Sequence, residues 1–251
     1  MTNRLSALFA IAAGLLAAQS PAFESASLKP AVMTPANRSL VGMTGGPGTS
    51  DPTRIGYHLI SLHHLLTVAY DVQDFQLLGP DWLGTELFDL DATLPPETSK
   101  EQLALMLQNL LAERFKIVLR KEEKEMTVYD LVVAKGGPKL IKSSVTAGST
   151  LKSGNVMMVA PIGDTLHLIG RSASTATLAV YLAKLTARPV FDQTGLDDHF
   201  NIDLSFGGGD MPGGETITGA VEHQLGLKLT TRKGPVAMLV IDHADKMPTE
   251  N

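Results

Sequence analysis

The same strand pattern occurs twice in this chain, 112 residues apart (positions 88 and 200, and again 115 and 227). Apolar and polar residues alternate over Phe88–Leu94 and over Phe200–Phe206, and this period of two is typical of a half-buried β-strand. A second pair of strand starts, near Phe115 and Leu227, has the same offset. We therefore predict two diverged copies of one unit, each of about the usual size of a domain.

Helices are predicted between these strands. Ser61 is placed to cap a helix that runs to Tyr70. Ser99 and Gln102 form a capping box, which is followed by an apolar stripe at helical spacing that ends at Phe115. The second copy has similar but less regular helical patterns at 178–185 and 217–225.

Each copy is expected to end in two short strands. They are predicted at 116–121 and 126–134 in the first copy, as a hairpin, and at 227–232 and 236–243 in the second. The mixed-charge run Arg120–Glu125 between the first two is interpreted as a solvated strand or turn. The predicted fold class is α+β: two diverged copies of a β-α-β-α-β-β unit with small mixed sheets.

The first 22 residues have the layout of a secretory signal peptide. Arg4 precedes an apolar run over Leu5–Ala18, and Ser20–Ala22 places small residues where a signal peptidase cleaves. The run is short for a transmembrane helix. We expect export to the periplasm or out of the cell, with cleavage near Ala22 or closer to Ala18.

The chain contains no cysteine. An exported chain without disulfides depends on a packed hydrophobic core for its stability. A lipoprotein anchor is excluded too, because that modification needs a cysteine directly after the cleavage site. After the signal peptide no segment approaches roughly 18 consecutive apolar residues, so no further membrane-spanning segment is expected.

The charge balance argues against a nucleic-acid partner. The chain has 21 basic and 26 acidic residues. Removal of the signal peptide takes away one arginine and no acid, so the mature net charge is 20 − 26 = −6. Neutralising phosphates requires clustered lysine and arginine, and the sequence contains no such cluster.

Turn-rich segments suggest how the chain is divided. Residues 31–53, with Gly45–Gly48 at their centre, are interpreted as a long loop. Residues 142–155 are rich in Ser, Thr, Gly and Lys, which is typical of a linker. The predicted boundaries are a signal peptide at 1–22, a first unit at 23–141, a linker at 142–155, a second unit at 156–246 and a tail at 247–251.

Several longer motifs together resemble a known family. They are Phe23–Pro30, Gly79–Leu83, Phe88–Ala92, Met106–Lys116, Arg188–Leu196 and Val240–His243. They are similar to a large uncharacterised family of exported proteins from soil bacteria, some of them fused to membrane sensor-peptidases of the beta-lactam-sensing type. This resemblance implies a sensing or partner-binding role outside the cytoplasm. The element order also resembles the short periplasmic N-terminal domain of secretins and TonB-dependent transducers, an analogy of fold alone.

Two motifs have catalytic relatives, and each has a simpler interpretation; the histidines form no such motif. Asp192–Gly195 resembles the Asp-Thr-Gly loop of aspartic proteases, but the inserted Gln193 favours a structural turn with Gly195 at positive φ. Ser149–Lys152 fits the Ser-x-x-Lys nucleophile motif, but it lies in the linker without its partner motifs. The seven histidines include no His-x-x-x-His pair, so neither a metal site nor a cofactor is expected.

The sequence therefore predicts a non-enzymatic module for interaction or sensing in the cell envelope, with unidentified envelope proteins as partners. Exposed strand edges suit strand addition. The alternative is a small-molecule binder or hydrolase that uses the cleft between the two units. No catalytic residue is assigned, and the candidate ligand- or partner-binding residues are Trp82, Asp192 and His199. Trp82 either lines a groove or closes the edge of the core.

Overall fold

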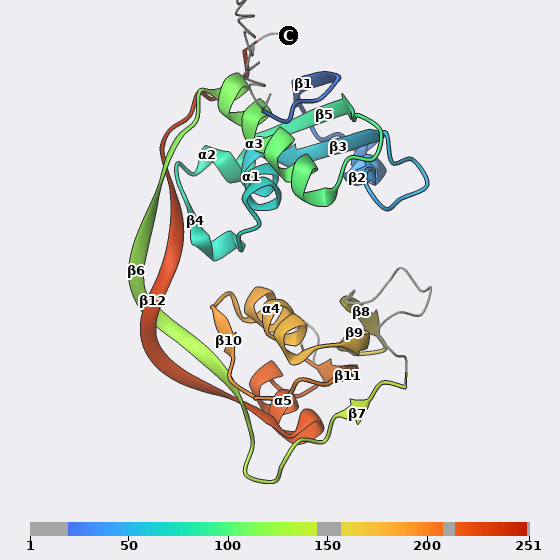
Figure 1. The fold of residues 1–251 in the computed structure, drawn as a ribbon, viewed down its shortest axis with the longest axis vertical. Coiled ribbons are helices and arrows are strands. Elements are labelled where there is room, and N and C mark those ends of the chain that lie inside the picture. The colour runs from blue at the N-terminus through green and yellow to red at the C-terminus, as the bar shows by residue number, and fades with distance from the viewer. Residues whose placement is uncertain (1–19, 145–156, 208–213, 250–251) are drawn as a thin grey trace, which may run out of the picture.

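The computed structural model describes residues 20–144, 157–207 and 214–249. Two lobes are joined along one side by a long ribbon of two strands (Figure 1). The described residues contain five α-helices and three four-stranded sheets, which confirms the predicted α+β class. Most of the predicted signal peptide, residues 145–155 of the predicted linker and the Ser149–Lys152 motif lie outside the described residues.

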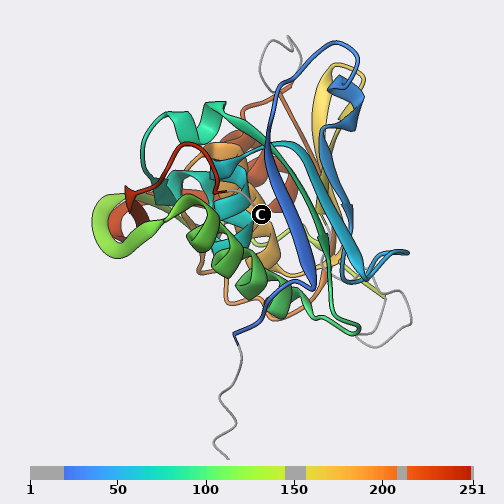
Figure 2. The same cartoon turned by 90° about the horizontal axis from the view of Figure 1, so that it is seen from above.

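The first lobe is an antiparallel sheet covered by helices on one face. Its strands follow the order β1-β5-β3-β2, and Figure 2 shows α3 alongside this sheet. The strands are β1 (Ser25–Ala31), β2 (Gly42–Gly45), β3 (Arg54–Ser61) and β5 (Leu87–Thr93). The helices are η1 (Arg38–Leu40), α1 (Leu62–Tyr70), η2 (Asp74–Gln76), α2 (Trp82–Thr85) and α3 (Lys100–Phe115), and the short strand β4 (Leu77–Leu78) lies between η2 and α2.

The helix starts predicted from the sequence are confirmed. Ser61 caps α1 through its side chain. The Ser99 hydroxyl accepts a hydrogen bond from the Gln102 N–H (3.2 Å), and the Gln102 side chain accepts one from the Ser99 N–H (2.8 Å). The apolar stripe of α3 packs on the sheet, where the Phe115 ring meets Phe88 edge to face with centroids 5.0 Å apart. Local sequence therefore determines where these helices begin and which side they bury.

The prediction of a continuous loop at 31–53 is wrong. Residues 42–45 form β2, which pairs with β3 from Gly42 opposite His58 to Gly45 opposite Ile55. Two of the four β2 residues are glycines, which have low strand propensity, so nothing in the local sequence indicates a strand. Pairing with β3 creates it, and β2 is one edge of the sheet.

The second lobe has a sheet in the order β7-β11-β9-β8. Its strands are β7 (Ile141–Lys142), β8 (Met157–Ile162), β9 (Thr165–Ala173) and β11 (Phe200–Phe206), and its helices are α4 (Thr175–Thr186) and α5 (Ile217–Leu225). If β7, β11, β9 and β8 are matched in turn with β1, β5, β3 and β2, the two sheets have the same strand order. A common origin of the two halves by duplication stays a prediction.

The predicted pairs of short strands at the end of each unit are wrong. β6 (Val118–Val133) and β12 (Leu227–His243) are each one continuous strand, and they pair with each other antiparallel along their whole length. In a hairpin, the second half of each segment would fold back and pair with the first half. Here β6 and β12 pair with each other instead, so β6 continues through the mixed-charge run Arg120–Glu125 without a turn. The parallel strands β4 and β10 (Val190–Asp192) complete the sheet in the order β10-β6-β12-β4.

The ribbon contributes to the cores of both lobes. The end of β12 places Leu239 and Ile241 in the core of the first lobe. The end of β6 places Leu131, and the start of β12 places Leu227, in the core of the second lobe. The first lobe thus takes Leu239 and Ile241 from the second half of the chain, and the second lobe takes Leu131 from the first half.

Candidate functional site

The three residues predicted for a site between the units lie in different places. Trp82 is half-buried and packs against the core of the first lobe, as expected for a residue that closes the core edge. His199 is exposed in the second lobe, where its backbone carbonyl accepts a hydrogen bond from the Ser143 N–H (2.8 Å). Within the described residues, no hydrogen bond or ion pair joins Trp82, Asp192 and His199 to one another.

Asp192 is held inside a turn, as the structural interpretation of its motif predicted. One carboxylate oxygen accepts a hydrogen bond from the hydroxyl of Thr175 (2.6 Å), which is 1% exposed. The other accepts hydrogen bonds from the N–H (3.0 Å) and the hydroxyl (2.7 Å) of Thr194. Gly195 has a φ of 66°. These contacts tie the turn after β10 to the first residue of α4, and both carboxylate oxygens of Asp192 accept hydrogen bonds within the lobe.

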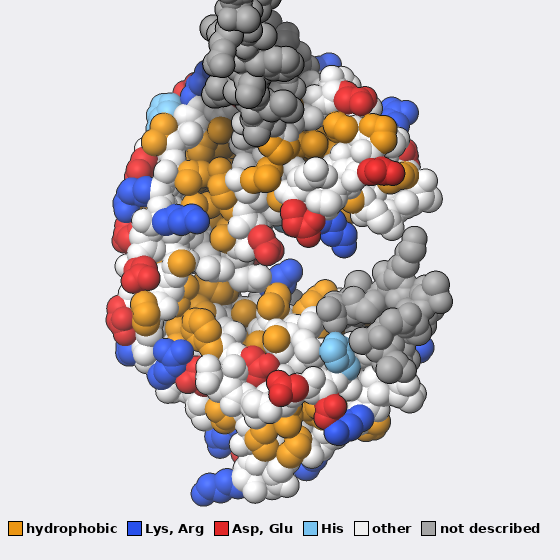
Figure 3. All heavy atoms as spheres, viewed as in Figure 1, with side chains coloured by type: hydrophobic (Ala, Val, Ile, Leu, Met, Phe, Trp, Pro, Cys, Tyr) orange, Lys and Arg blue, Asp and Glu red, His pale blue; other side chains and the backbone are white. Residues whose placement is uncertain are grey.

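A hollow separates the two lobes on the side away from the β6–β12 ribbon (Figure 3). A better-defined site lies within the first lobe. It is a groove of about 430 Å³ between the edge strand β2, the inner face of β3, and helices α1 and α3. Pockets that hold small ligands have volumes of roughly 300–1,000 Å³. Its lining residues are Met43, Gly45, Gly46, Pro47, Ile55, Tyr57, Val68, Asp71, Lys100, Glu101, Leu103, Ala104 and Leu107.

The walls of the groove follow from simple periodicities. Ile55 and Tyr57 are two residues apart on β3, so both side chains lie on the face of the sheet that the helices cover. Leu103 and Leu107 are four residues apart and lie on one face of α3. Met43 lies opposite Tyr57 in the register of β2 with β3. The floor is therefore apolar, and Met43 at the open side is 57% exposed.

Tyr57 is the one phenol of this groove, and its environment is unusual. The residue is only 2% exposed, yet its hydroxyl makes no hydrogen bond to any described residue, nor is its oxygen sealed inside the core. Burial raises the pKa of Tyr57 to about 12, so the hydroxyl stays protonated at physiological pH. Tyr57 lines the groove with a hydrogen-bond donor that has no partner among the described residues, and buried phenols normally have one.

Charged residues surround the mouth of the groove. Lys100 and Glu101 begin α3, and Asp71 ends α1 in the left-handed conformation with φ of 49°. The Ser99 hydroxyl donates a hydrogen bond to Glu101 (2.7 Å) and lowers its pKa. The mouth therefore carries two carboxylates and one ammonium group around an apolar floor.

The second lobe differs at the matching position. Tyr57 pairs with Leu90, and Gly170 pairs with Ile202, the residue 112 positions after Leu90. A Cβ on Gly170 would lie 2.8 Å from Cγ of Met157, which is 2% exposed. In the second lobe, the position that corresponds to Tyr57 is therefore Gly170, and the buried side chain of Met157 fills the space beside it. In the first lobe, Tyr57 lines an open groove instead.

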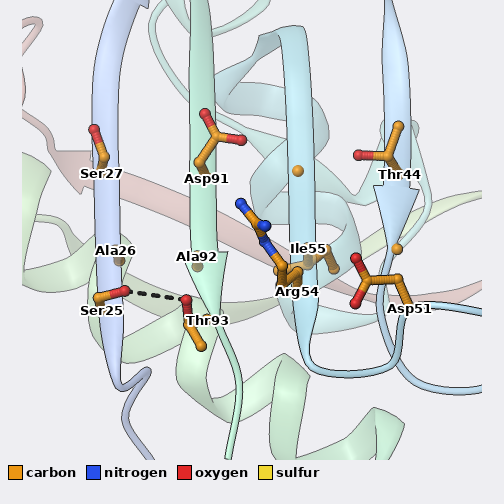
Figure 4. Close-up of a pocket in the computed structure, with 12 residues that line it drawn as sticks. Ser25, Ala26, Ser27, Thr44, Asp51, Arg54, Ile55, Asp91, Ala92 and Thr93 are labelled. Carbon is orange, nitrogen blue, oxygen red and sulfur yellow. Dashed lines mark hydrogen bonds between the residues drawn. The ribbon is translucent and has the colours of Figure 1, made fainter.

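The opposite face of the first sheet carries a polar trough of about 590 Å³. Hydroxyl, carboxylate and guanidinium groups project from all four strands and the β2–β3 loop (Figure 4). The Arg54 side chain extends toward Asp91, and Arg54 forms no ion pair with a described carboxylate. Gly56 leaves room for the side chains of its neighbours, because a Cβ there would lie 2.7 Å from Nε2 of His58 and 2.8 Å from the Thr44 hydroxyl.

Sequence reasoning missed Tyr57, Met43 and the rest of the groove. The glycines of 42–48 indicated a loop, and no local pattern shows that a core tyrosine lacks a partner for its hydroxyl. In the described ranges, no three His, Asp or Glu side chains gather as a metal site. None of the described helices is both long and apolar enough to cross a membrane.

The fold and the groove define a two-lobed α+β protein with a ligand-sized apolar site in one lobe. Over residues 63–244 the chain matches the family described as "Protein of unknown function (DUF3738)", and it belongs to that family. This confirms the predicted resemblance to a family without an assigned activity. The soil origin, the fusions and the secretin-type analogy stay predictions. No curated protein and no solved structure matches the chain.

Proposed function

We propose that this chain is a non-enzymatic interaction module that holds an apolar group of an envelope partner in the groove beside Tyr57. The observation that carries the proposal is a buried phenol that lines an apolar groove and whose hydroxyl has no partner among the described residues. Apolar walls with one convergent polar group are typical of binding sites. An acceptor on the partner would complete the hydrogen bond of Tyr57.

The alternative, a binder or hydrolase in the cleft between the units, has less support. It would need Trp82, Asp192 and His199 to converge, and Asp192 instead binds Thr175 and Thr194 inside its own lobe. The groove also has a defined volume and wall within one lobe, so it does not depend on how the two lobes approach each other.

A photoreactive amino acid at Val68 tests the proposal in cells. Val68 lines the groove and is 38% exposed, whereas the matched control Leu105 is 46% exposed on α3 and does not line it. We expect an adduct with an envelope protein from position 68, weaker by about tenfold from position 105. Ala104→Met, which fills the groove with a good helix former, is expected to abolish it, and Leu105→Met to leave it unchanged. An adduct that survives Ala104→Met contradicts the proposal.

Tyr57→Phe separates a ligand-binding hydroxyl from a structural one. Because the hydroxyl bonds to none of the residues that the structure describes, its removal is expected to change the free energy of unfolding by less than about 0.5 kcal/mol. The yield of the Val68 adduct is expected to fall, since a hydrogen bond is worth about 0.5–1.5 kcal/mol. Chemical denaturation and quantified crosslinking measure the two effects. Lost stability with unchanged crosslinking would show that the hydroxyl serves the fold instead.

We also propose that the chain acts after export, which rests on the charge, apolar run and small residues of positions 1–22. Protein purified from the envelope or medium is expected to begin at Phe23 when its N-terminus is sequenced. Aspartates in place of Leu15 and Leu16 interrupt the apolar run and are expected to leave the uncleaved chain in the cytoplasm. An uncleaved N-terminus on the exported protein would refute cleavage at this site.

A further inference from the structure

We infer that the partner is an extended peptide segment that adds a strand to the outer edge of β2 and alternates apolar with basic or hydroxyl side chains. This inference rests on the proposed function of the groove and names the kind of partner that fits it. Three features of β2 carry it: its position in the sheet, the two surfaces on either side of it, and the charges around them.

β2 is the last strand in the order β1-β5-β3-β2 and pairs with β3 alone among the described residues. The outer edge of such a strand has backbone N–H and C=O groups that another strand is able to bind. Gly42 has no atom within 4 Å of where its Cβ would be. Glycine in an edge strand permits close approach of a second backbone.

The long ribbon strand offers no equivalent edge at its C-terminal half. The segment Val236–Ile241 of β12 pairs with β6 on one side, and at Leu239–Val240 it pairs with β4 on the other. Strand addition at this segment would displace β4. The free edge of β2 lies instead beside the groove.

The two faces of β2 lead to two different surfaces. Met43 lines the apolar groove on the helix side, whereas Thr44 lines the polar trough on the other side, and Gly45 borders both. Side chains of a paired strand alternate in the same way. A segment bound along β2 would therefore direct every second side chain toward the groove and the others toward the trough.

The charges near β2 select the polar side chains of that segment. The trough contains the carboxylates of Asp51 and Asp91 and the guanidinium of Arg54. The groove mouth adds Asp71 and Glu101 against Lys100. The residues that line the trough and the groove include four carboxylates and two cations, and Nε2 of His58 lies 3.7 Å from Asp91. The excess of carboxylates attracts a basic segment, and the attraction weakens with salt.

The test uses the whole mature protein and a labelled, capped heptapeptide, Ser-Leu-Lys-Leu-Lys-Leu-Ser, followed by fluorescence anisotropy. A peptide of the same composition with its three leucines adjacent is the control. We expect saturable binding of the alternating peptide and an affinity lower by about tenfold for the control. Ala104→Met is expected to weaken binding, Leu105→Met to have no effect, and Asp51→Asn to lower the affinity for the lysine peptide.

N-methylation of the peptide backbone distinguishes strand pairing from simple capture of a side chain. Successive N–H groups of a strand point to opposite edges, so methylation at alternate positions blocks one edge at a time. We expect one methylated series to lose binding by about tenfold or more and the other to retain it. Equal behaviour of the two series overturns the inference, as does the failure of all peptides to bind.

The Val68 adduct then separates the two proposals. If the adduct forms and is abolished by Ala104→Met while no peptide binds, the proposed function of the groove is supported and strand addition is wrong. If the adduct is absent as well, both are wrong. Sedimentation velocity at rising protein concentration tests whether the chain pairs with itself along β2. Dimers that dissociate when the peptide is added would identify a second copy of this chain as the occupant of the edge, and the inference of a separate partner would then be wrong.

Discussion

A fragment of residues 23–141, the first unit as predicted from the sequence, is expected to remain unfolded when expressed alone. It lacks β12, which pairs with β6 along its whole length and with β4. It also lacks Leu239 and Ile241, which are 3% and 5% exposed in the core of the first lobe. A lobe without its neighbouring strands has long unpaired edges and an open core, and small domains tolerate little loss of buried area.

A second fragment makes this prediction specific. Glu125 lies opposite Pro235 in the ribbon, so an Asn-Gly hairpin turn is able to join residue 125 to residue 235. The chain 23–125, Asn-Gly, 235–249 restores the half of β12 that pairs with residues 118–125 of β6 and with β4, and it is expected to fold. Far-UV circular dichroism and amide NMR dispersion of the two fragments give the result. A folded 23–141 fragment would show that the exchange of strands between the lobes is dispensable.

Gly226→Ala is expected to lower the free energy of unfolding by about 2–3 kcal/mol, the second-largest effect that we predict. Gly226 ends α5 with a φ of 64°, where a residue with a Cβ is strained. A Cβ there would lie 2.3 Å from the carbonyl oxygen of Gly137, a backbone atom in the turn after β6. The Gly226 carbonyl also accepts a hydrogen bond from the Ala134 N–H (3.0 Å). The segments around Gly226 and Gly137 therefore cannot move apart to make room for a Cβ without losing this hydrogen bond.

Gly84→Ala is the matched control, with an effect of opposite sign. Gly84 lies in α2, has no positive φ, and has nothing within 4 Å of its Cβ position. Alanine is favoured over glycine in a helix, so this variant is expected to gain about 0.5–1 kcal/mol. Urea denaturation of both variants provides the comparison. Equal effects of the two substitutions would mean that the close approach at Gly137 is not a constraint.

The helices and the alternating strands are visible in the sequence because their causes are local. Ser61 and Ser99 cap the turns that follow them, and the stripe that ends at Phe115 lies on one side of a helix whatever it packs against. The turn at Asp192–Gly195 is local in the same sense, since Asp192 binds Thr194 two residues away. The α+β class follows from these elements.

The candidate site was not visible for the opposite reason. β2 is a strand only because β3 lies beside it, and its glycines by themselves indicate a loop. Tyr57 has the pattern of any core residue on a strand, and whether its hydroxyl finds a partner depends on α1 and α3, which meet it only in the folded lobe. The predicted site residues Trp82, Asp192 and His199 were chosen for their chemistry, and the fold separates them.

The sequence by itself determined the class of fold, the helix starts and the repeated strand pattern, because these depend on neighbours within a few residues. The tertiary structure alone decided that β6 and β12 are unbroken and that each lobe completes its core with strand ends from the other half. It also decided that β2, which pairs only with β3 among the described residues, lies at the edge of its sheet beside a groove. Those features depend on pairing between segments about 110 residues apart. The free energy of such pairing comes from hydrogen bonds and buried area that no local stretch of sequence contains.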